Sequence, residues 1–467
     1  MLKLALLQPT NTMLAKDHSY NRTKLFERLS AAGVSGLVYL VGADNTELYD
    51  TDRDMQFRQE SYFFWATGCT VPGSIAVLDI ATKQYKLFIP KVSDETAVWI
   101  GVPPTLAEYA AELIHCPETE ELLYTEALPE YLAQAKPSAV HCLVKMDLDV
   151  SCPITSDVLR AHMSECRVIK SDAEVEALYA ACVAGAEGHT ACMHKMLPGT
   201  QEYVADGLMH TAARNHESYW TSFETISAVG KHASTLHFLG GATKVEDGKI
   251  LLIDAGVSVK GYVSDHTRVM PGGSRFTPNQ EAMYNIVLRA NKECIKGCKP
   301  GTKWEDLHAL SLRILLEGLR EHGLVRKDTG SIEEQLDLDI PAVFMPHGLG
   351  HLIGCDTHDV GGYPAGVERM TRPGYRNMRM RRTLDVGYAV TVEPGMYFVP
   401  QMVDAALASE KQGPHLNEAV IRQWQEECGG CRLEDVIIVT EGEPRILPAA
   451  PKELADIYAI RDKVVQK

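Results

Sequence analysis

The chain carries little positive charge and lacks long apolar stretches. Its 46 Lys and Arg residues face 62 Asp and Glu residues, so the formal net charge is −16, which argues against a nucleic-acid backbone as partner. No apolar run approaches the ~20 residues that a membrane span requires. A short apolar run near the N-terminus ends at Gln8 and Pro9, too early for the apolar region of a signal peptide. We therefore expect a protein that neither binds nucleic acid nor enters a membrane.

A disulfide framework is also unnecessary. Twelve cysteines are scattered through 467 residues, of which 45% are hydrophobic and 23% are charged. Such a chain can build two domains with large cores of their own, so we expect a reducing, cytoplasmic location. Cys428 and Cys431 form a lone Cys-x-x-Cys pair shortly before Glu434. A redox switch that acts on metal affinity is one hypothesis for this pair.

Residues 1–165 have the pattern of an α/β domain. An amphipathic helix is predicted over residues 21–31 and an apolar strand over residues 36–41. Residues 74–80 and 85–89 have the composition of two strands, and the short turn between them predicts a hairpin. We find no group of side chains in this domain with the spacing of a catalytic site.

A second domain is expected over residues 166–467, and it contains a weak internal repeat. Ser171 and Glu174 have the spacing of a capping box, which predicts that a helix begins there. A Pro-Gly turn at residues 196–200 and another at residues 298–302 each lie between two helical patterns. Such an echo is what a duplicated α+β unit would leave in the sequence.

The second domain also contains five potential metal ligands, four carboxylates and one imidazole. An oxygen-rich set suits a pair of divalent ions such as Mn²⁺ better than a single tetrahedral Zn²⁺. Two ions about 3.5–4 Å apart can share a hydroxide that attacks an amide carbonyl. The set therefore predicts a dinuclear-metal hydrolase. The ligands are Asp254, Asp265, His351, Glu393 and Glu434.

Each ligand taken alone has an ordinary structural explanation, because carboxylates at strand ends commonly accept backbone hydrogen bonds. The pair Asp254 and Asp265 is harder to explain in this way. A strand, a turn and a return strand would bring the two side by side, and buried carboxylates repel unless a cation lies between them. His347 and His351 have the spacing of a zinc-protease helix, but the Glu is missing and two glycines disfavour a helix.

Beyond these ligands, the chain resembles the metallopeptidases of the pita-bread fold, and among them the prolidases (Xaa-Pro dipeptidases). The resemblance extends over nearly the whole chain and is most specific over residues 237–440. It implies a creatinase-like α/β N-terminal domain and an α+β pita-bread catalytic domain with an internal pseudo-twofold axis. The motifs are Ile253-Asp254-Ala255-Gly256, Ser264-Asp265-His266-Thr267-Arg268, His347-Gly348-Leu349-Gly350-His351, His358-Asp359-Val360-Gly361-Gly362, Val392-Glu393-Pro394-Gly395 and Arg432-Leu433-Glu434.

The resemblance implies a role for each metal ligand. Asp254 would chelate the first ion, and Asp265 and Glu434 would bridge both ions. His351 and Glu393 would complete the second ion's coordination. Glu393 would also shuttle a proton from the bridging water.

Residues around the ligands receive roles from the same resemblance. His237 and His358 match histidines that polarise the scissile carbonyl and stabilise the tetrahedral intermediate, and Thr267 would support a bridging Asp. Two positions depart from the family pattern. His266 stands where an apolar residue is common, and Phe223 stands where prolidases often carry Tyr, so we expect any difference to lie in substrate handling.

The segment between His358 and Glu393 separates the possible activities, because it resembles an insertion found in prolidases. A dipeptidase must recognise a free C-terminal carboxylate, and the planar guanidinium of arginine binds a carboxylate bidentately. Arg379 matches the prolidase arginine in that role. A solvated basic loop is the alternative explanation. The arginines are Arg376, Arg379, Arg381 and Arg382.

We therefore predict a metallo-dipeptidase that cleaves Xaa-Pro dipeptides with a free C-terminal proline. The metal ligands alone also leave open the activity of a methionine aminopeptidase and that of an aminopeptidase P, which removes the residue before proline from longer peptides. A non-catalytic binding protein of the same fold is disfavoured because all five ligands are present. The resemblance also implies a homodimer in which the stretch around Trp99 approaches the partner's site, with a core position for Trp99 as the alternative.

Overall fold

The computed structural model describes residues 15–465, so the N-terminal run with Gln8 and Pro9 lies outside the described residues. The chain divides into two compact units, residues 1–167 and 168–467. Within the described part of the chain, no helix combines the length and the hydrophobicity that crossing a bilayer requires.

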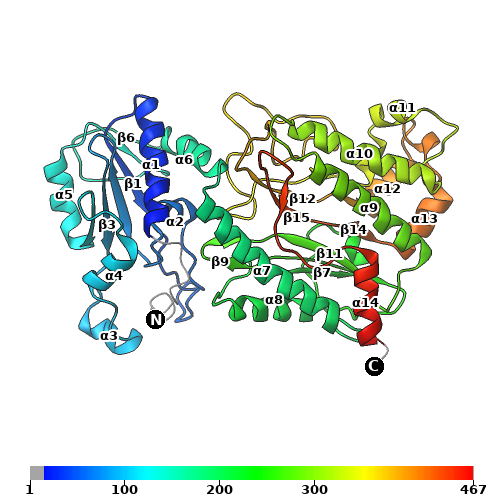
Figure 1. The fold of residues 1–467 in the computed structure, drawn as a ribbon, viewed down its shortest axis with the longest axis horizontal. Helices are drawn as coiled ribbons and strands as arrows, with labels where there is room; N and C mark the ends of the chain where they lie inside the picture. Colours follow the sequence, from blue (N-terminus) through cyan, green and yellow to red (C-terminus); the bar gives the residue numbers. More distant parts are fainter. Residues whose placement is uncertain (1–14, 466–467) are drawn as a thin grey trace. The chain divides into compact units, whose positions relative to one another are not determined.

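The first unit is a six-stranded sheet flanked by helices (Figure 1), in the order β4-β3-β2-β1-β5-β6. The predicted hairpin is confirmed, since β2 and β3 pair antiparallel with Ile75 opposite Phe88. The predicted α/β character is confirmed as well. The elements are α1 (Ala15–Ala31), β1 (Leu37–Val41), α2 (Ser61–Thr67), β2 (Ile75–Asp79), β3 (Gln84–Ile89), α3 (Asp94–Ile100), α4 (Leu106–Leu113), β4 (Glu120–Tyr124), α5 (Leu128–Ala135), β5 (Val140–His141), β6 (Ile154–Thr155) and α6 (Leu159–Val168).

Helix α3 presents apolar side chains to the solvent. Trp99 is 66% exposed, and Val98 and Val102 beside it are exposed as well. The alternative that placed Trp99 in the core is therefore wrong. An exposed tryptophan flanked by exposed valines has the composition of a contact surface.

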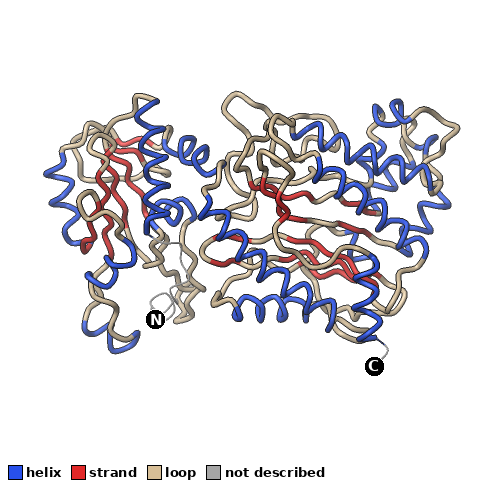
Figure 2. The backbone as a smooth tube through the Cα atoms, in the orientation of Figure 1, coloured by secondary structure: helices blue, strands red, loops and turns tan. Residues whose placement is uncertain are grey.

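The second unit places short strands between helices (Figure 2). Its main sheets have the orders β11-β8-β7 and β12-β15-β16, with β13-β14 and β9-β10 as smaller pairs. The elements are α7 (Asp172–Lys195), α8 (Val204–Asn215), β7 (Ile226–Val229), β8 (Ile250–Ala255), β9 (Ser258–Val259), β10 (Tyr262–Val263), β11 (His266–Pro271), α9 (Pro278–Lys296), α10 (Trp304–Glu321), α11 (Ile332–Asp337), β12 (Ala389–Val392), β13 (Gly395–Tyr397), α12 (Pro400–Leu407), α13 (Glu418–Glu427), β14 (Gly430–Arg432), β15 (Asp435–Ile438), β16 (Arg445–Ile446) and α14 (Leu454–Val465).

Helix α7 begins where the sequence predicted. The Ser171 side chain accepts a hydrogen bond from the Glu174 backbone N–H, and the Glu174 side chain accepts one from the Ser171 N–H. This reciprocal pair satisfies backbone donors that a helix start leaves without intrahelical partners. The capping box is therefore confirmed, and it fixes the residue at which the first long helix of this unit starts.

The predicted repeat is visible in the two Pro-Gly turns. Gly199 N–H donates to the Val245 carbonyl and Gly301 N–H donates to the Leu384 carbonyl, at 2.8 and 2.9 Å. Each turn joins two packed helices, α7 with α8 and α9 with α10. An antiparallel strand pair follows each helix pair, β8 with β11 and β12 with β15. In the view of Figure 1, the first helix pair lies below the strands and the second lies above them.

The turn glycines adopt a conformation that other residues disfavour. Gly199 has a φ of 93° and Gly301 a φ of 85°, and an added Cβ would meet no atom within 4 Å at either position. We predict that Gly199→Ala and Gly301→Ala each lower the free energy of unfolding by about 1–2 kcal/mol, from backbone strain alone.

Urea denaturation checks this prediction, with Gly207→Ala as the matched control. Gly207 lies inside helix α8 and its added Cβ would also meet nothing, so this change should stabilise the protein by about 0.4–1 kcal/mol. Equal effects at the three glycines would contradict the strained-turn account.

Candidate active site

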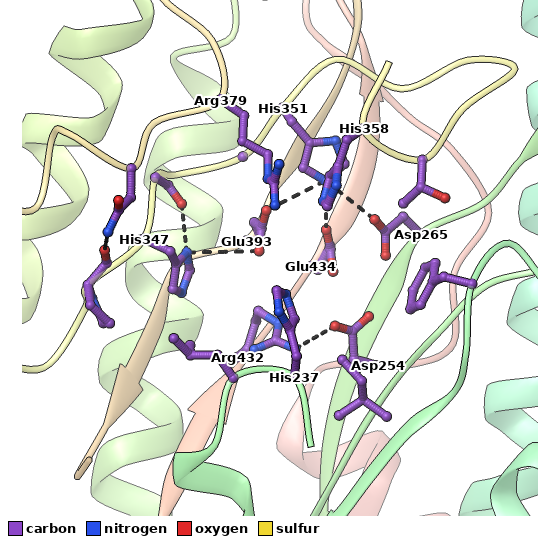
Figure 3. A pocket seen from close by; sticks show the side chains of 18 of the residues that line it. His237, Asp254, Asp265, His347, His351, His358, Arg379, Glu393, Arg432 and Glu434 are labelled. Carbon is purple, nitrogen blue, oxygen red and sulfur yellow. Dashed lines mark hydrogen bonds and ion pairs between the residues drawn. The ribbon is translucent and has the colours of Figure 1, made fainter. Parts of the chain in front are cut away.

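The predicted metal ligands converge on one cavity of about 710 Å³ in the second unit (Figure 3). Potential ligand atoms of Asp265, His351 and Glu434 all lie within 4.8 Å of one another, and all three residues are buried. His351 Nε2 lies 3.4 Å from Asp265 Oδ2 and 3.9 Å from Glu434 Oε1. It also lies 3.6 Å from Glu393 Oε1. Three of the predicted carboxylate ligands thus surround the imidazole nitrogen of the fourth ligand, His351.

Asp254, the fifth predicted ligand, lines the same cavity from strand β8. Thr267 on β11 lies opposite Asp254 in the antiparallel register, and Asp265 precedes β11, so the strand and its return strand bring both carboxylates to one end. Asp254 Oδ2 accepts a hydrogen bond of 2.5 Å from Arg432. Asp254 Oδ1 and Asp265 Oδ1 are buried without a hydrogen-bond partner among the described residues. Buried oxygens of this kind are suited to a cation.

The electrostatics of the cluster favour a cation in the same place. Burial raises the pKa of Asp265 to about 6 and the pKa of Glu393 to about 7. Burial, together with the charges of Asp265 and Glu393, raises the pKa of Glu434 well above its ordinary value. These carboxyls cannot all ionise side by side at neutral pH without added positive charge. The hard oxygen donors and the single imidazole fit divalent cations.

His351 is oriented for ligation by its own backbone. Its Nδ1 lies 2.9 Å from the Leu352 carbonyl oxygen, a contact that requires the proton on Nδ1, so a neutral His351 ring carries its lone pair on Nε2. Burial lowers the pKa of His351, but the hydrogen bond to Asp265 and the charge of Glu393 raise it further, so the net shift is upward. A backbone acceptor on the far nitrogen is the arrangement by which proteins aim a metal-binding histidine.

A buried network holds the carboxylates from behind. Thr267 Oγ1 donates to Glu434 Oε2 at 2.8 Å. Thr267 therefore supports Glu434, whereas the resemblance implied that it would support a bridging Asp. Arg432 Nε donates to Thr267 Oγ1 at 2.9 Å, and its Nη1 donates to the Tyr397 hydroxyl at 2.7 Å. No sequence pattern indicated a role for Arg432 or Tyr397, although Arg432 stands inside one of the quoted motifs.

Three histidines line the cavity beside the ligands, namely His237, His347 and His358. The ring of His358 lies edge-on to His351 at 4.4 Å. Burial and the positive charges of His351 and Arg379 lower the pKa of His358 to about 3. Burial and the charge of Arg432 lower the pKa of His347 to about 3 as well. Both rings are therefore neutral at physiological pH, and each carries a single N–H donor.

His347 is a cavity residue to which the sequence analysis gave no role. Its Nε2 lies 3.0 Å from the Tyr397 hydroxyl, and its Nδ1 lies 2.7 Å from the Gly348 carbonyl oxygen and 3.9 Å from Glu393 Oε2. The available signal was its place at the start of a motif that ends in His351. The spacing of the two histidines by itself predicted no role for His347, because a zinc-protease helix is disfavoured there.

The arginines of the insertion point to different places. Arg379 lines the cavity, whereas Arg376 lines a neighbouring one. Arg381 donates to the Glu368 carbonyl and Arg382 to the Gly361 carbonyl. Within residues 15–465, Arg379 has no hydrogen bond or ion pair, so its guanidinium is available to a ligand.

The two departures from the family pattern differ in position. Phe223 lines the cavity, whereas His266 does not. The His266 ring is fully buried, lies edge-on to His189 at 6.1 Å, and has no hydrogen-bond partner for either nitrogen in the described part of the chain. Of the two departures, only Phe223 therefore changes the cavity itself, which lacks the hydroxyl that a Tyr would place there.

The cysteine pair near Glu434 is poorly suited to redox sensing. Cys428 and Cys431 are fully buried, and burial raises the pKa of both thiols. Because the thiolate is the reactive form, protonated and inaccessible thiols are inert. This observation argues against the redox hypothesis.

Comparisons with known proteins match both units. Residues 176–441 match metallopeptidase family M24, and residues 18–141 match the aminopeptidase P N-terminal domain. The chain is 35% identical to the Xaa-Pro dipeptidase of Mus musculus over 94% of this chain and 92% of that protein. It is 32% identical to a probable Xaa-Pro aminopeptidase of Pyrenophora tritici-repentis over 95% of each. Zinc-substituted Escherichia coli aminopeptidase P in complex with product has a TM-score of 0.80 at 25% identity, over 97% of this chain and 99% of that one. The predicted fold class is thereby confirmed.

The Thr267 hydrogen bond to Glu434 leads to a prediction about metal affinity. Thr267→Val removes the hydroxyl but keeps the shape, so Glu434 loses its orienting donor and divalent-metal affinity should fall about 10- to 100-fold. Isothermal titration with Mn²⁺ measures this change. Thr267→Ser keeps the hydroxyl and should retain the affinity, and equal losses in both variants would contradict the hydrogen-bond explanation.

The raised pKa of Glu393 leads to a prediction about how the stability of the chelated, metal-free protein depends on pH. Because the pKa rises from 4.5 to about 7 on folding, the folded chain binds the proton more tightly. Protonation of Glu393 therefore stabilises the folded state. This stabilisation is complete at low pH and disappears as the pH rises through 7. Relative to Glu393→Gln, wild-type unfolding free energy should fall by up to about 1.4 kcal/mol per pH unit between pH 5 and 7. Saturating Mn²⁺ should abolish this trend, and a flat difference without metal would refute it.

Proposed function

The chain belongs to metallopeptidase family M24, and from that premise we propose that it hydrolyses dipeptides of the Xaa-Pro type. Family membership makes it a metal-dependent peptidase, and the substrate is our proposal. The Xaa-Pro dipeptidase and the probable Xaa-Pro aminopeptidase that it resembles both carry the Xaa-Pro bond in their names. The observation that carries the choice of a dipeptide is the unpartnered guanidinium of Arg379 in the cavity.

Two divalent ions, most consistently Mn²⁺, would be held by the five ligands. Asp254 would bind the first ion, and Asp265 and Glu434 would each bind both ions. His351 and Glu393 would bind the second ion. When bound, such ions supply Lewis acidity and lower the pKa of a water molecule towards neutrality. The preference for Mn²⁺ rests on the donor set, which has four carboxylates for one imidazole and no thiolate.

The chain's own side chains would perform the remaining steps. His237 and His358 would donate N–H groups to the scissile carbonyl oxygen and to the negative charge that develops on it. His358 is suited to this role because its lowered pKa keeps the ring neutral. A carboxylate oxygen of Glu393 would take a proton from the attacking water and return it to the proline nitrogen as the C–N bond breaks.

Arg379 would bind the free carboxylate of the C-terminal proline. A guanidinium that has no internal partner can offer two parallel N–H donors to a carboxylate. The neighbouring Arg369 is less available, because its Nη1 donates to the Met378 carbonyl at 2.7 Å. A substrate that continues beyond proline has no carboxylate at this position, so the arginine favours dipeptides.

Aminopeptidase P activity is the second candidate. The similarity to the probable Xaa-Pro aminopeptidase of Pyrenophora tritici-repentis over 95% of each chain favours it. The two activities share the metal ligands and the histidines and differ only in what lies beyond proline. A non-catalytic binding role finds no support in a site that retains all five ligands.

We also propose that the enzyme is a cytoplasmic homodimer. The exposed Val98, Trp99 and Val102 on and beside helix α3 support a partner contact. The cytoplasmic location is supported by twelve cysteines scattered through a chain whose large cores need no disulfide framework.

The choice of substrate is tested with Gly-Pro and Gly-Pro-Gly on chelated protein and again after Mn²⁺ is added. We expect the dipeptide alone to be cleaved, and only with metal. Preferential cleavage of the tripeptide would establish aminopeptidase P activity and would contradict the proposed binding of the proline carboxylate by Arg379. Cleavage of neither peptide by the metal-loaded protein would refute the proposed function.

The carboxylate-binding role predicts the effect of Arg379→Met. Losing a charge-assisted hydrogen bond worth about 1.5–3 kcal/mol should raise KM for Gly-Pro about 10- to 100-fold with little change in kcat. Arg376→Met is the matched control, since Arg376 lies on the same loop but not at this cavity. Similar changes in both variants would show a general electrostatic effect instead of a specific contact.

A further inference from the structure

A lysine and an aspartate that are not themselves metal ligands form an ion pair inside the second unit. Lys170 Nζ lies 2.8 Å from Asp359 Oδ2, and each side chain is only 1% exposed. Burying two charges is expensive, and a buried pair commonly contributes less to stability than apolar side chains of the same size. Its position beside a cavity histidine suggests that the pair orients that histidine.

Asp359 follows His358 directly, so the pair acts on the loop that carries this histidine. Asp359 N–H donates to the Leu352 carbonyl at 2.8 Å, and its Oδ1 accepts from Val360 N–H at 2.9 Å. The residues from Leu352 to Asp359 therefore fold into a closed loop. Gly354 allows this closure, because a Cβ there would lie 2.1 Å from Asp359 Oδ2.

The lysine end of the pair is held by helix α7. Lys170 N–H donates to the Gly387 carbonyl at 2.8 Å, and the next residue, Ser171, is the N-cap of the helix. Glu174 completes the capping box and also accepts a hydrogen bond of 2.8 Å from the Tyr262 hydroxyl. The ammonium group thus projects from a fixed backbone, as a positioning residue requires.

We propose that Lys170 is a positioning residue that acts through Asp359 to hold the His358 ring at the scissile carbonyl. The inference rests on the proposed function, because it assumes that His358 contacts the reacting carbonyl. The ion pair fixes the backbone on the C-terminal side of His358, and the contact of Asp359 N–H with Leu352 ties this point to the residue after His351. A histidine misplaced by about 1 Å can cost about 100-fold in rate.

The direct test is Lys170→Met in the metal-loaded enzyme with Gly-Pro as substrate. We expect kcat to fall about 10- to 100-fold and KM to change less than threefold, because His358 acts on charge that develops in the transition state. Bound metal, measured by elemental analysis, should stay at the wild-type level. An unchanged kcat would overturn the proposal, and so would a loss of metal, which would place the effect on His351.

A second variant separates positioning from stability. Lys170→Met combined with Asp359→Leu replaces the pair by apolar side chains and should bring the thermal midpoint back to near the wild-type value. We expect kcat to remain low, since no charge pair then holds the loop. Recovery of kcat together with the thermal midpoint would overturn the proposal.

A double-mutant cycle with His358→Ala shows whether the effect passes through His358. When the ring is absent there is nothing left to position, so Lys170→Met should reduce kcat less than twofold in that background. A full additional loss would overturn the proposal. Arg22→Met, which breaks the buried pair with Glu120 in the first unit, is the control, with a lower thermal midpoint and an unchanged kcat.

The outcomes also distinguish this inference from the proposed function. If wild-type protein cleaves neither Gly-Pro nor Gly-Pro-Gly, the proposed function fails and the inference fails with it. If wild type cleaves Gly-Pro and Lys170→Met cleaves it equally well, only the role of Lys170 fails.

Discussion

The mutual repulsion of buried carboxylates is the constraint on which the site depends. Asp265, Glu393 and Glu434 meet at one imidazole, and burial raises the pKa of each carboxyl. Without added positive charge, such a cluster is stable only when partly protonated. Two divalent ions would supply that charge, so metal binding and the ionisation of the site are one event.

The duplicated architecture explains how one chain brings so many carboxylates together. In the first half of the unit, Asp254 stands near the end of β8 and Asp265 just before its antiparallel partner β11. In the second half, Glu393 follows β12 and Glu434 precedes β15. Each antiparallel strand pair thus delivers two carboxylates at one end.

Fixed cations next to the cluster hold its backbone and leave the cavity face of the ligands free. Arg268 donates to the Glu434 carbonyl at 2.7 Å and pairs with Asp435. Burial raises the pKa of Asp435, but Arg268 and Lys452 lower it further, so this carboxylate stays ionised and binds its cations internally. Glu434 and Asp435 are adjacent in sequence, but the pKa of Glu434 is raised and that of Asp435 is lowered. The difference arises because Glu434 faces other carboxylates, whereas Asp435 faces Arg268 and Lys452.

The sequence predicted what depends on local pattern or on motif. The capping box at Ser171, the hairpin of the first unit and the two Pro-Gly turns follow from residue type and spacing, and the quoted motifs named residues that line the cavity. The exposure of Trp99 and the separate directions of the four arginines could not be predicted. The exposure of Trp99 depends on how helix α3 packs. The directions of the arginines depend on the irregular segment between His358 and Glu393, which has no hydrophobic period from which side-chain directions can be predicted. The network around Arg432 joins residues more than 160 positions apart in sequence, and nothing local reports such contacts.

The coupling of metal binding to ionisation is measured directly by titrating Mn²⁺ into chelated protein at pH 7, in two buffers that differ in ionisation enthalpy. Comparison of the heats gives both the number of ions bound and the number of protons released. We predict two ions per chain and the release of at least one proton, because the cluster is partly protonated before metal arrives. Binding of a single ion, or of two ions without proton release, would contradict it.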